Sequence, residues 1–405
     1  MSHSFDLDRL DRIQTWMGGY VDTRRYPGCA TLVTQNGEDV WYGETGMRRV
    51  EEQVPWTRDT VARIYSMTKP VTTVALMMLI ERGVTHLDAS IANFIPAFKD
   101  TRVLASDAEA ITDTHPCAPP TLHQLLTHTS GLTYPFNPGP LTEALNEADM
   151  LFRCNSAPLG EECERLATFP LAFPPGQKWE YSVGIDVIGR VVEILSGQPL
   201  DAFFEEHIFG PLGMTDTGFS VRDDQLDRFA SLYTPLPGDA LDLNAAKGGD
   251  TLRLVDVAET SPFRAATCFS GGGGLVGTMD DYLKFAEMLR RDGEFNGARL
   301  LSRSTVQFMK MNHLAGDIAD MGPTSFAEQP MTGTGFGLGG GVVTSPARTR
   351  TPGSVGDFSW GGIASTFFWI DPVHHLTVLF FTQLSPSSSY PSRSQLKALV
   401  HGALL

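Results

Sequence analysis

The sequence has few cysteines, a deficit of positive charge and no long apolar run. Its 405 residues include five cysteines, an odd number, and none belongs to a Cys-x-x-Cys pair. Scattered cysteines of this kind are typical of free thiols in a reducing cytoplasm. Lys and Arg total 31 against 47 Asp and Glu, which gives a net charge of −16. Such a surface repels polyphosphate and anionic lipid, so we expect neither a nucleic-acid partner nor a membrane partner.

Several other signals are also missing. No apolar run approaches the roughly 20 residues of a membrane-spanning helix, and residues 1–10 lack the apolar core of a signal peptide. We therefore expect a cytoplasmic protein. No HExxH motif is present, and the adjacent His374 and His375 lack the one-turn spacing of a helical metal pair. With no phosphate-binding or dinucleotide-binding glycine motif either, we expect no metal and no cofactor.

Strand patterns occupy both ends of the chain, and helical patterns occupy the middle. Residues 29–34 and 40–44 flank an Asn-Gly pair, which is typical of a β-hairpin. Residues 363–370 and 376–382 flank an Asp-Pro turn and predict a second hairpin. Between about 96 and 250, short helical stretches alternate with Pro- and Gly-rich loops. Because a strand needs a partner, the two ends most simply share one antiparallel sheet.

The sequence thus predicts an α+β fold of the α/β sandwich type, in which helices flank an antiparallel sheet. The sheet domain would comprise residues 1–95 and 255–405, and residues 96–254 would form an inserted, mostly helical domain. Hydrophobic periodicity predicts the individual helices. They span residues 6–24, 71–82, 122–128, 181–195, 200–208, 278–291 and 392–405.

A serine and a lysine stand three residues apart in Ser66-Met-Thr-Lys69, at the start of the most apolar predicted helix. This spacing puts both on one helical face, with Cβ atoms about 5–6 Å apart. A helix start disfavours an ammonium group and favours an oxyanion, so Lys69 could take the serine proton. The alternative is an ordinary serine with a surface lysine. The same spacing recurs at Ser394 and Lys397, but on a peripheral helix, so context favours Ser66 as the nucleophile.

Two further segments could support acyl chemistry. Tyr181 stands at a predicted loop-to-helix junction, where a nearby lysine would let its phenol relay a proton. The alternative is a half-buried tyrosine bonded to the backbone. The segment Ser359-Trp-Gly-Gly-Ile363 leads into a predicted strand, and its glycines would let backbone N–H groups approach an oxyanion. The alternative for this segment is a β-bulge or a tight bend.

Together these segments resemble the serine β-lactamase and penicillin-binding-protein superfamily, in particular the class C β-lactamase-like branch that includes family VIII carboxylesterases. The resemblance covers roughly residues 10–385, and its first landmark motif is Ser66-Met-Thr-Lys-Pro. Further landmarks follow in the order expected for the family. They are residues 122–132, 175–182, 211–214 with Thr217, 270–275 and 335–338.

The resemblance implies a role for each candidate residue. Ser66 would be the nucleophile, Lys69 its activating partner and Tyr181 a proton relay. Trp360, with Gly361 and Gly362 after it, falls on the Lys-Thr-Gly element that lines the substrate site of the family. The next residue, Ile363, would supply the second oxyanion N–H beside that of Ser66.

Two positions depart from the β-lactamase pattern: Val183 replaces an asparagine, and Trp360 replaces the first lysine. Losing an amide partner and a cationic anchor weakens recognition of an anionic amide, because hydrogen bonds to charged groups are worth ~1.5–3 kcal/mol each. We therefore expect a serine carboxylesterase that hydrolyses short- to medium-chain neutral esters through a Ser66 acyl-enzyme. The alternatives are β-lactamase, D-peptidase or acyltransferase activity at the same site, or a catalytically silent binding or sensor protein.

Overall fold

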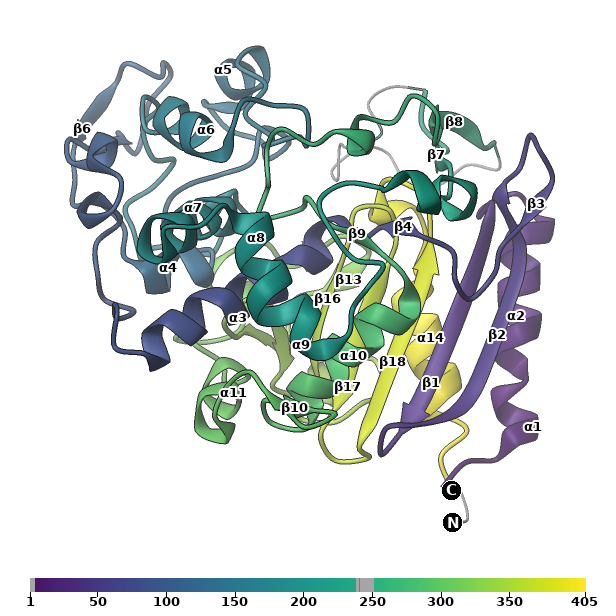
Figure 1. Cartoon of the computed structure of the whole chain (residues 1–405). Coiled ribbons are helices and arrows are strands. Elements are labelled where there is room, and N and C mark those ends of the chain that lie inside the picture. The colour runs from purple at the N-terminus through teal and green to yellow at the C-terminus, as the bar shows by residue number, and fades with distance from the viewer. Residues whose placement is uncertain (1–3, 238–239, 241–250) are drawn as a thin grey trace.

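The computed structural model of the chain describes residues 4–237, 240 and 251–405. Its centre is an eight-stranded antiparallel sheet in the order β14-β15-β16-β17-β18-β1-β2-β3 (Figure 1). The predicted α+β fold, with both ends of the chain in one sheet, is confirmed. The strands are β1 (Gly28–Gln35), β2 (Glu38–Arg49), β3 (Val54–Pro55), β14 (Thr334–Phe336), β15 (Gly341–Val343), β16 (Phe358–Gly361), β17 (Phe367–Asp371) and β18 (Leu376–Thr382).

The first and last long strands join the two ends of the chain. β1 pairs antiparallel with β18, which places Leu32 opposite Leu379. The predicted β1–β2 hairpin is present, and its turn residues Asn36 and Gly37 have φ angles of 56° and 88°. Two successive positive φ angles match the twist of a tight hairpin, which explains the Asn-Gly pair.

Helices cover both faces of the sheet. Because side chains alternate along a strand, Phe380 of β18 packs into one core with α2 and α14, whereas Leu379 packs into the opposite core with α3 and α10. Figure 1 shows α2 lying along β1 and β2. The helices of these two layers are α1 (Leu7–Leu10), α2 (Arg12–Asp22), α3 (Thr68–Glu81), α10 (Met279–Arg290) and α14 (Ser392–His401).

The middle of the chain forms a second, mostly helical region that packs on α3. α7 is its central helix and lies against both α3 and α4. The proposed division into residues 1–95 with 255–405 and residues 96–254 stays a prediction, and residues 241–250 lie outside the described part. The helices here are α4 (Leu122–Leu126), α5 (Thr142–Glu147), α6 (Leu159–Leu166), α7 (Gly184–Ser196), α8 (Leu200–Phe204) with a π-turn at Glu205–Phe209, and α9 (Gly210–Leu212).

Short two-stranded ribbons decorate both regions, and the sequence patterns did not predict them. Two-residue and three-residue strands are too short to show an alternating pattern. The ribbons are β4 (Ala62–Arg63) with β9 (Val276–Gly277), β5 (Arg102–Leu104) with β6 (Thr114–Pro116), β7 (Leu232–Thr234) with β8 (Arg253–Asp256), β10 (Glu294–Phe295) with β11 (Ala298–Arg299), and β12 (Ser325–Phe326) with β13 (Gln329–Pro330). Three further helices are α11 (Arg303–Met309), α12 (Ile318–Met321) and α13 (Pro346–Thr349).

Several predicted boundaries were wrong. The strand expected at 363–370 begins at Phe367, because the Gly362 N–H bonds to the Thr366 carbonyl and closes a tight turn first. Consequently Ile363 lies in that turn, while Trp360 lies in β16. The helix expected at 181–195 begins at Gly184 and leaves Tyr181 in the preceding segment.

The terminal helices also differ from prediction. The helix expected at 6–24 is two helices. Asp11 lies between them, as the C-cap of α1 and the N-cap of α2. The helix expected at 392–405 ends at His401. No helix within the described ranges has the length and apolar character to cross a membrane.

Candidate active site

Ser66 lies in a single 3₁₀ turn, Tyr65–Met67, directly before α3. The preceding residue, Tyr65, has a φ of 42°, which is a costly left-handed conformation for a residue with a side chain. Burial of the Tyr65 ring edge-on against Phe263 holds this conformation. The turn therefore presents the Ser66 hydroxyl at the edge of the core, as expected.

Lys69 is fully buried, and its ammonium group makes three hydrogen bonds. Its Nζ donates to Ser66 Oγ at 3.2 Å, to Tyr134 Oη at 3.1 Å and to the Gly272 carbonyl at 2.7 Å. Three acceptors match the three donors of an ammonium group. The lysine of this motif is thus held in one orientation with one donor on the serine.

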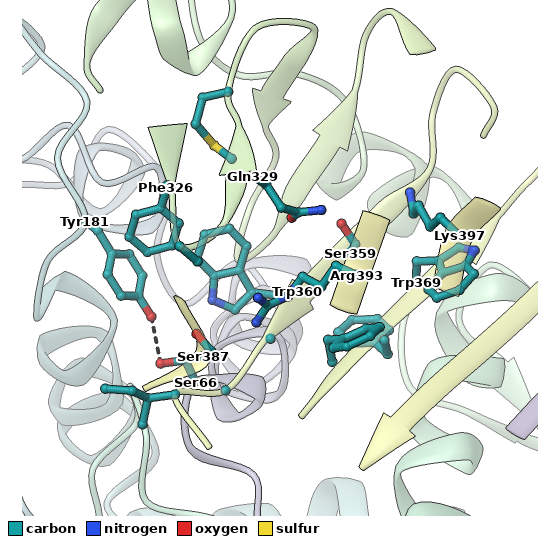
Figure 2. Close-up of a pocket in the computed structure, with 17 residues that line it drawn as sticks. Ser66, Tyr181, Phe326, Gln329, Ser359, Trp360, Trp369, Ser387, Arg393 and Lys397 are labelled. Atoms are coloured by element: carbon teal, nitrogen blue, oxygen red, sulfur yellow. Dashed lines mark hydrogen bonds between the residues drawn. The ribbon is translucent and has the colours of Figure 1, made fainter. Parts of the chain in front are cut away.

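Tyr181 approaches Ser66 from the other side. Its hydroxyl donates a 2.7 Å hydrogen bond to Ser66 Oγ, drawn as the dashed line in Figure 2. Its ring centroid lies 4.6 Å from Lys69 Nζ, which is within cation–π range. The structure therefore brings Ser66, Lys69 and Tyr181 together at one point.

The second Ser-x-x-Lys pair has a different environment. Lys397 Nζ donates to Asp357 Oδ2 at 3.0 Å, on another element of the fold. No hydrogen bond joins Lys397 to Ser394 among the described residues. The local context that favoured Ser66 over Ser394 thus corresponds to a clear difference in geometry.

The turn after β16 places backbone groups beside Ser66. A Cβ on Gly362 would meet the Ile64 carbonyl and lie 2.6 Å from Thr366 Oγ1, so only glycine fits. Within the described part of the chain, no hydrogen bond occupies the N–H of Ile363. Ile363 and Ser66 line the same two hollows, so both residues border the space at the Ser66 hydroxyl.

Trp360 forms an aromatic wall at this site. Its ring stacks on Phe326 at 5.8 Å and lies 5.5 Å from the ring of Tyr181 (Figure 2). Its Nε1 is buried and has no hydrogen-bond partner among the described residues. In contrast, Val183 is fully buried at the start of α7, so it offers the site no polar group.

Sequence reasoning missed Asp186 and Tyr134, two buried residues that help to hold Lys69 in place. Asp186 accepts hydrogen bonds from Ser270 Oγ and from the Gly272 N–H, at 2.5 and 2.9 Å. Those bonds fix the loop whose Gly272 carbonyl receives Lys69. The run 270–275 was a landmark of the resemblance, but Asp186 and Tyr134 carried no signal, because neither stands at a recognisable spacing.

Burial is the main influence on the pKa values of Tyr134, Asp186 and His128. It raises the pKa of Tyr134 well above its ordinary value, so the phenol keeps its proton. Burial also raises the pKa of Asp186, and the nearby Lys69 ammonium opposes this effect. For His128, burial and then Lys69 lower the pKa well below 6.5, so the ring is neutral. Its Nδ1 lies 3.1 Å from Ser182 Oγ.

Two hollows meet at Ser66, and the residues Ser66, Tyr181 and Ile363 line both. The space within them, including the part open to solvent, is about 700 and 790 Å³. The walls are mainly aromatic or aliphatic. The first is also lined by Phe326, Met331, Trp360 and Phe367, and the second by Tyr65, Tyr134, Phe136, Leu151, Phe152 and Phe263.

The cations of the first hollow are paired with buried carboxylates. Arg393 Nη1 lies 2.5 Å from Glu328 Oε2, and Lys397 is bonded to Asp357. The second hollow is lined by one cation, Arg153, which pairs with the exposed Asp149 at 2.9 Å. Among the described residues, neither hollow contains a cluster of three metal-binding side chains.

Comparison with known proteins agrees with this fold. The β-lactamase family model matches residues 13–402. Protein Rv1367c of Mycobacterium tuberculosis is 36% identical over 390 residues, covering 94% of this chain and 91% of that protein. Esterase EstB of Burkholderia gladioli is 33% identical over 391 residues, covering 94% and 92%. The solved structure of EstCE1, a hydrolase with promiscuous acyltransferase activity, has a TM-score of 0.80 at 28% identity, covering 98% and 99%.

The chain therefore belongs to the β-lactamase family. The resemblance to β-lactamase-like serine hydrolases close to family VIII carboxylesterases is confirmed.

Proposed function

We propose that this protein is a serine carboxylesterase that hydrolyses neutral esters of short- to medium-length acyl groups. The convergence of Lys69 and Tyr181 on Ser66 Oγ is the observation that carries this proposal. Similarity to esterase EstB supports ester chemistry over amide chemistry. Ser66 is the nucleophile, the Lys69–Tyr181 pair takes its proton once that pair has lost one of its own, and the N–H groups of Ser66 and Ile363 receive the oxyanion.

Acylation begins with attack of Ser66 Oγ on the ester carbonyl carbon. The reactive state is the one in which the Lys69–Tyr181 pair has lost one proton, and the serine proton passes to this pair through the hydrogen bonds that both groups make to Ser66 Oγ. The carbonyl oxygen becomes an oxyanion held by the two backbone N–H groups. As the tetrahedral intermediate collapses, the C–O bond breaks, and Tyr181 returns the proton to the departing alcohol.

Deacylation repeats these steps with water. A water molecule enters beside Tyr181, gives one proton to the Lys69–Tyr181 pair and adds to the acyl carbon. Collapse breaks the bond to Ser66 Oγ, which regains the proton, and the carboxylic acid leaves. Asp186 acts indirectly, because it fixes the Gly272 carbonyl that orients Lys69.

The neutral substrate follows from the walls of the site. A β-lactam carboxylate would need a free cation, but Arg393 and Lys397 are paired with the buried Glu328 and Asp357, and Arg153 in the second hollow is paired with Asp149. Trp360 adds apolar surface instead of charge. Releasing a cation from a buried pair would leave the carboxylate unpaired at a large cost.

Acyl transfer is the second candidate. Because the two hollows meet at Ser66, an alcohol can approach the acyl-enzyme in place of water. EstCE1 is described as a hydrolase with promiscuous acyltransferase activity. An alcohol that binds in either hollow would compete with water for the acyl group. The ratio of ester product to acid product measures this partition.

The experiment compares hydrolysis of p-nitrophenyl butyrate and nitrocefin by one preparation, with Ser66→Ala as the blank. We expect kcat/KM for the ester to exceed that for nitrocefin by at least a hundredfold. Nitrocefin turnover above ester turnover would overturn the esterase proposal. Equal turnover of the ester by Ser66→Ala would overturn the site.

A further inference from the structure

Three side chains that can bind a metal meet at the end of the sheet where the β17–β18 turn lies. Asp371 ends β17, His374 lies in the β17–β18 turn, and His401 is the last residue of α14. One carboxylate oxygen and one ring nitrogen from each histidine all lie within 4.8 Å of one another. None of the three lines either hollow at Ser66.

The distances in this cluster bracket those around a metal ion. Asp371 Oδ2 lies 2.9 Å from His374 Nδ1, to which it is hydrogen-bonded, and 3.9 Å from His401 Nε2. Tetrahedral ligands at the usual zinc–nitrogen and zinc–oxygen distances lie roughly 3.3 Å apart. Small side-chain rotations would therefore bring all three ligand atoms onto one ion.

His401 gives independent evidence for a ligand. Its side chain is only 6% exposed, yet its Nε2 has no hydrogen-bond partner among the described residues. A buried polar atom without a partner costs about 1–3 kcal/mol and calls for an explanation. This Nε2 faces the carboxylate of Asp371, and a metal ion between them would satisfy it.

The carboxylate of Asp371 is already oriented as in metal sites. Ser354 Oγ donates to its Oδ2 at 2.8 Å, and the N–H groups of Val373 and His374 donate to its Oδ1 at 2.8 and 3.0 Å. Hydrogen bonds of this kind fix a ligating carboxylate in known metal proteins. The side chain is fully buried and cannot turn to water.

The local charge and the access route also fit a cation. Lys397 lies one helical turn before His401, but its charge is balanced by Asp357 at 3.0 Å. The cluster itself carries the charge of the Asp371 carboxylate, and Arg350 lines the groove beside it. An open groove leads to His374 and His401, and the His374 side chain is 39% exposed, so an ion and a water can enter.

We propose that Asp371, His374 and His401 form a zinc site, with water as the fourth ligand, that ties the end of α14 to the β17–β18 turn. Two imidazoles and one carboxylate, without a thiolate, suit Zn²⁺ rather than Mg²⁺ or Ca²⁺. The second histidine of the proposed site is thus His401, and not His375, which is next to His374 in the sequence. The site is independent of the esterase proposal, because its ligands contact none of Ser66, Lys69 and Tyr181.

The test measures zinc binding to full-length protein that carries no polyhistidine tag and has been stripped with a chelator. Competition with a chromophoric zinc indicator should give one Zn²⁺ per chain, with a dissociation constant at or below the micromolar range. Excess Mg²⁺ or Ca²⁺ should not displace it. Zinc should raise the midpoint of thermal unfolding, and Co²⁺ in its place should give the visible absorption of a four-coordinate ion.

Matched variants locate the ion. His374→Gln and His401→Gln should each weaken zinc binding at least tenfold and abolish the thermal shift, whereas His375→Gln should leave both unchanged. His374 is partly exposed, so His374→Gln serves even if His401→Gln unfolds. The proposal is overturned if the wild type binds no zinc, if both variants bind like wild type, or if Mg²⁺ competes equally. Ester turnover is expected to persist in His374→Gln, so loss of zinc and loss of esterase activity are separate results.

Discussion

The hydroxyl of Tyr181 donates a 2.7 Å hydrogen bond to Oγ of Ser66, across 115 residues of sequence. Ser66 belongs to the predicted sheet domain and Tyr181 to the predicted helical insertion. The proposed chemistry therefore depends on how the two regions pack, and α7 against α3 is a principal contact between them. This packing sets the distance from the tyrosine to the serine.

Tyr181→Phe tests the role of this hydroxyl. The ring contacts with Trp360 and Phe326 remain, so the fold should be kept. Removal of a general acid and base should lower kcat for p-nitrophenyl butyrate by about 10²- to 10⁴-fold. Stopped-flow or steady-state hydrolysis checks the rate, and near-ultraviolet circular dichroism checks the packing. A kcat within threefold of wild type would remove Tyr181 from the mechanism.

The two Ser-x-x-Lys pairs give a direct comparison. Ser66→Ala removes the hydroxyl to which both Lys69 and Tyr181 donate and should reduce ester turnover to background. Ser394→Ala should leave turnover unchanged, because Lys397 is committed to Asp357. The measurement is kcat/KM for p-nitrophenyl butyrate. Similar losses in both variants would show that the nucleophile was chosen wrongly.

Gly362→Ala tests the proposed oxyanion turn. An added methyl group would collide with the Ile64 carbonyl and Thr366 Oγ1 and would displace the Ile363 N–H. Loss of one oxyanion donor should lower kcat by about 10²- to 10³-fold. Gly18→Ala is the matched control: it lies in α2 with open space around it, so it should keep activity and gain roughly 0.5–1 kcal/mol of stability. Full activity in Gly362→Ala would contradict the assignment.

Buried His128 predicts a pH dependence of stability. Its pKa in the folded protein is lowered well below 6.5 by burial and by Lys69. Below about pH 6.5, His128 binds a proton in the unfolded chain but stays neutral in the folded chain. The free energy of unfolding therefore falls as the pH falls. Each such histidine adds up to about 1.4 kcal/mol per pH unit.

The check is urea unfolding of wild type and His128→Asn at pH 7.5, 6.5 and 5.5. The variant should lose less stability between pH 6.5 and 5.5 than wild type. His115→Asn is the control, because its side chain is exposed and the wild-type slope should remain. An identical slope in wild type and His128→Asn would show that His128 does not contribute.

The sequence predicted features that depend on local periodicity. The hairpin at Asn36, the apolar helix after Ser66 and strand β18 all appear where the patterns placed them. The sequence also predicted that both ends of the chain share one sheet, although not that β1 is the strand that pairs with β18. The candidate nucleophile and its lysine could be proposed because they stand three residues apart at the start of the most apolar predicted helix; in the structure Ser66 lies in the 3₁₀ turn before α3 and Lys69 in α3.

Features set by distant contacts could not be predicted. Asp186 reaches Lys69 only through Ser270 and Gly272, which are more than 80 residues away in sequence. The placement of Ile363 in a turn depends on the Gly362–Thr366 hydrogen bond, which an apolar run of residues does not reveal. The approach of His401 to His374 likewise depends on the packing of α14 against the sheet.

Active-site titration with a fluorophosphonate tests the central claim most directly, because this probe forms a stable adduct with an activated serine. We expect one adduct per chain, located at Ser66 by peptide mapping, with loss of p-nitrophenyl butyrate turnover in proportion to labelling. Ser66→Ala should not react. Absence of labelling in the wild type, or full turnover after complete labelling, would contradict the account.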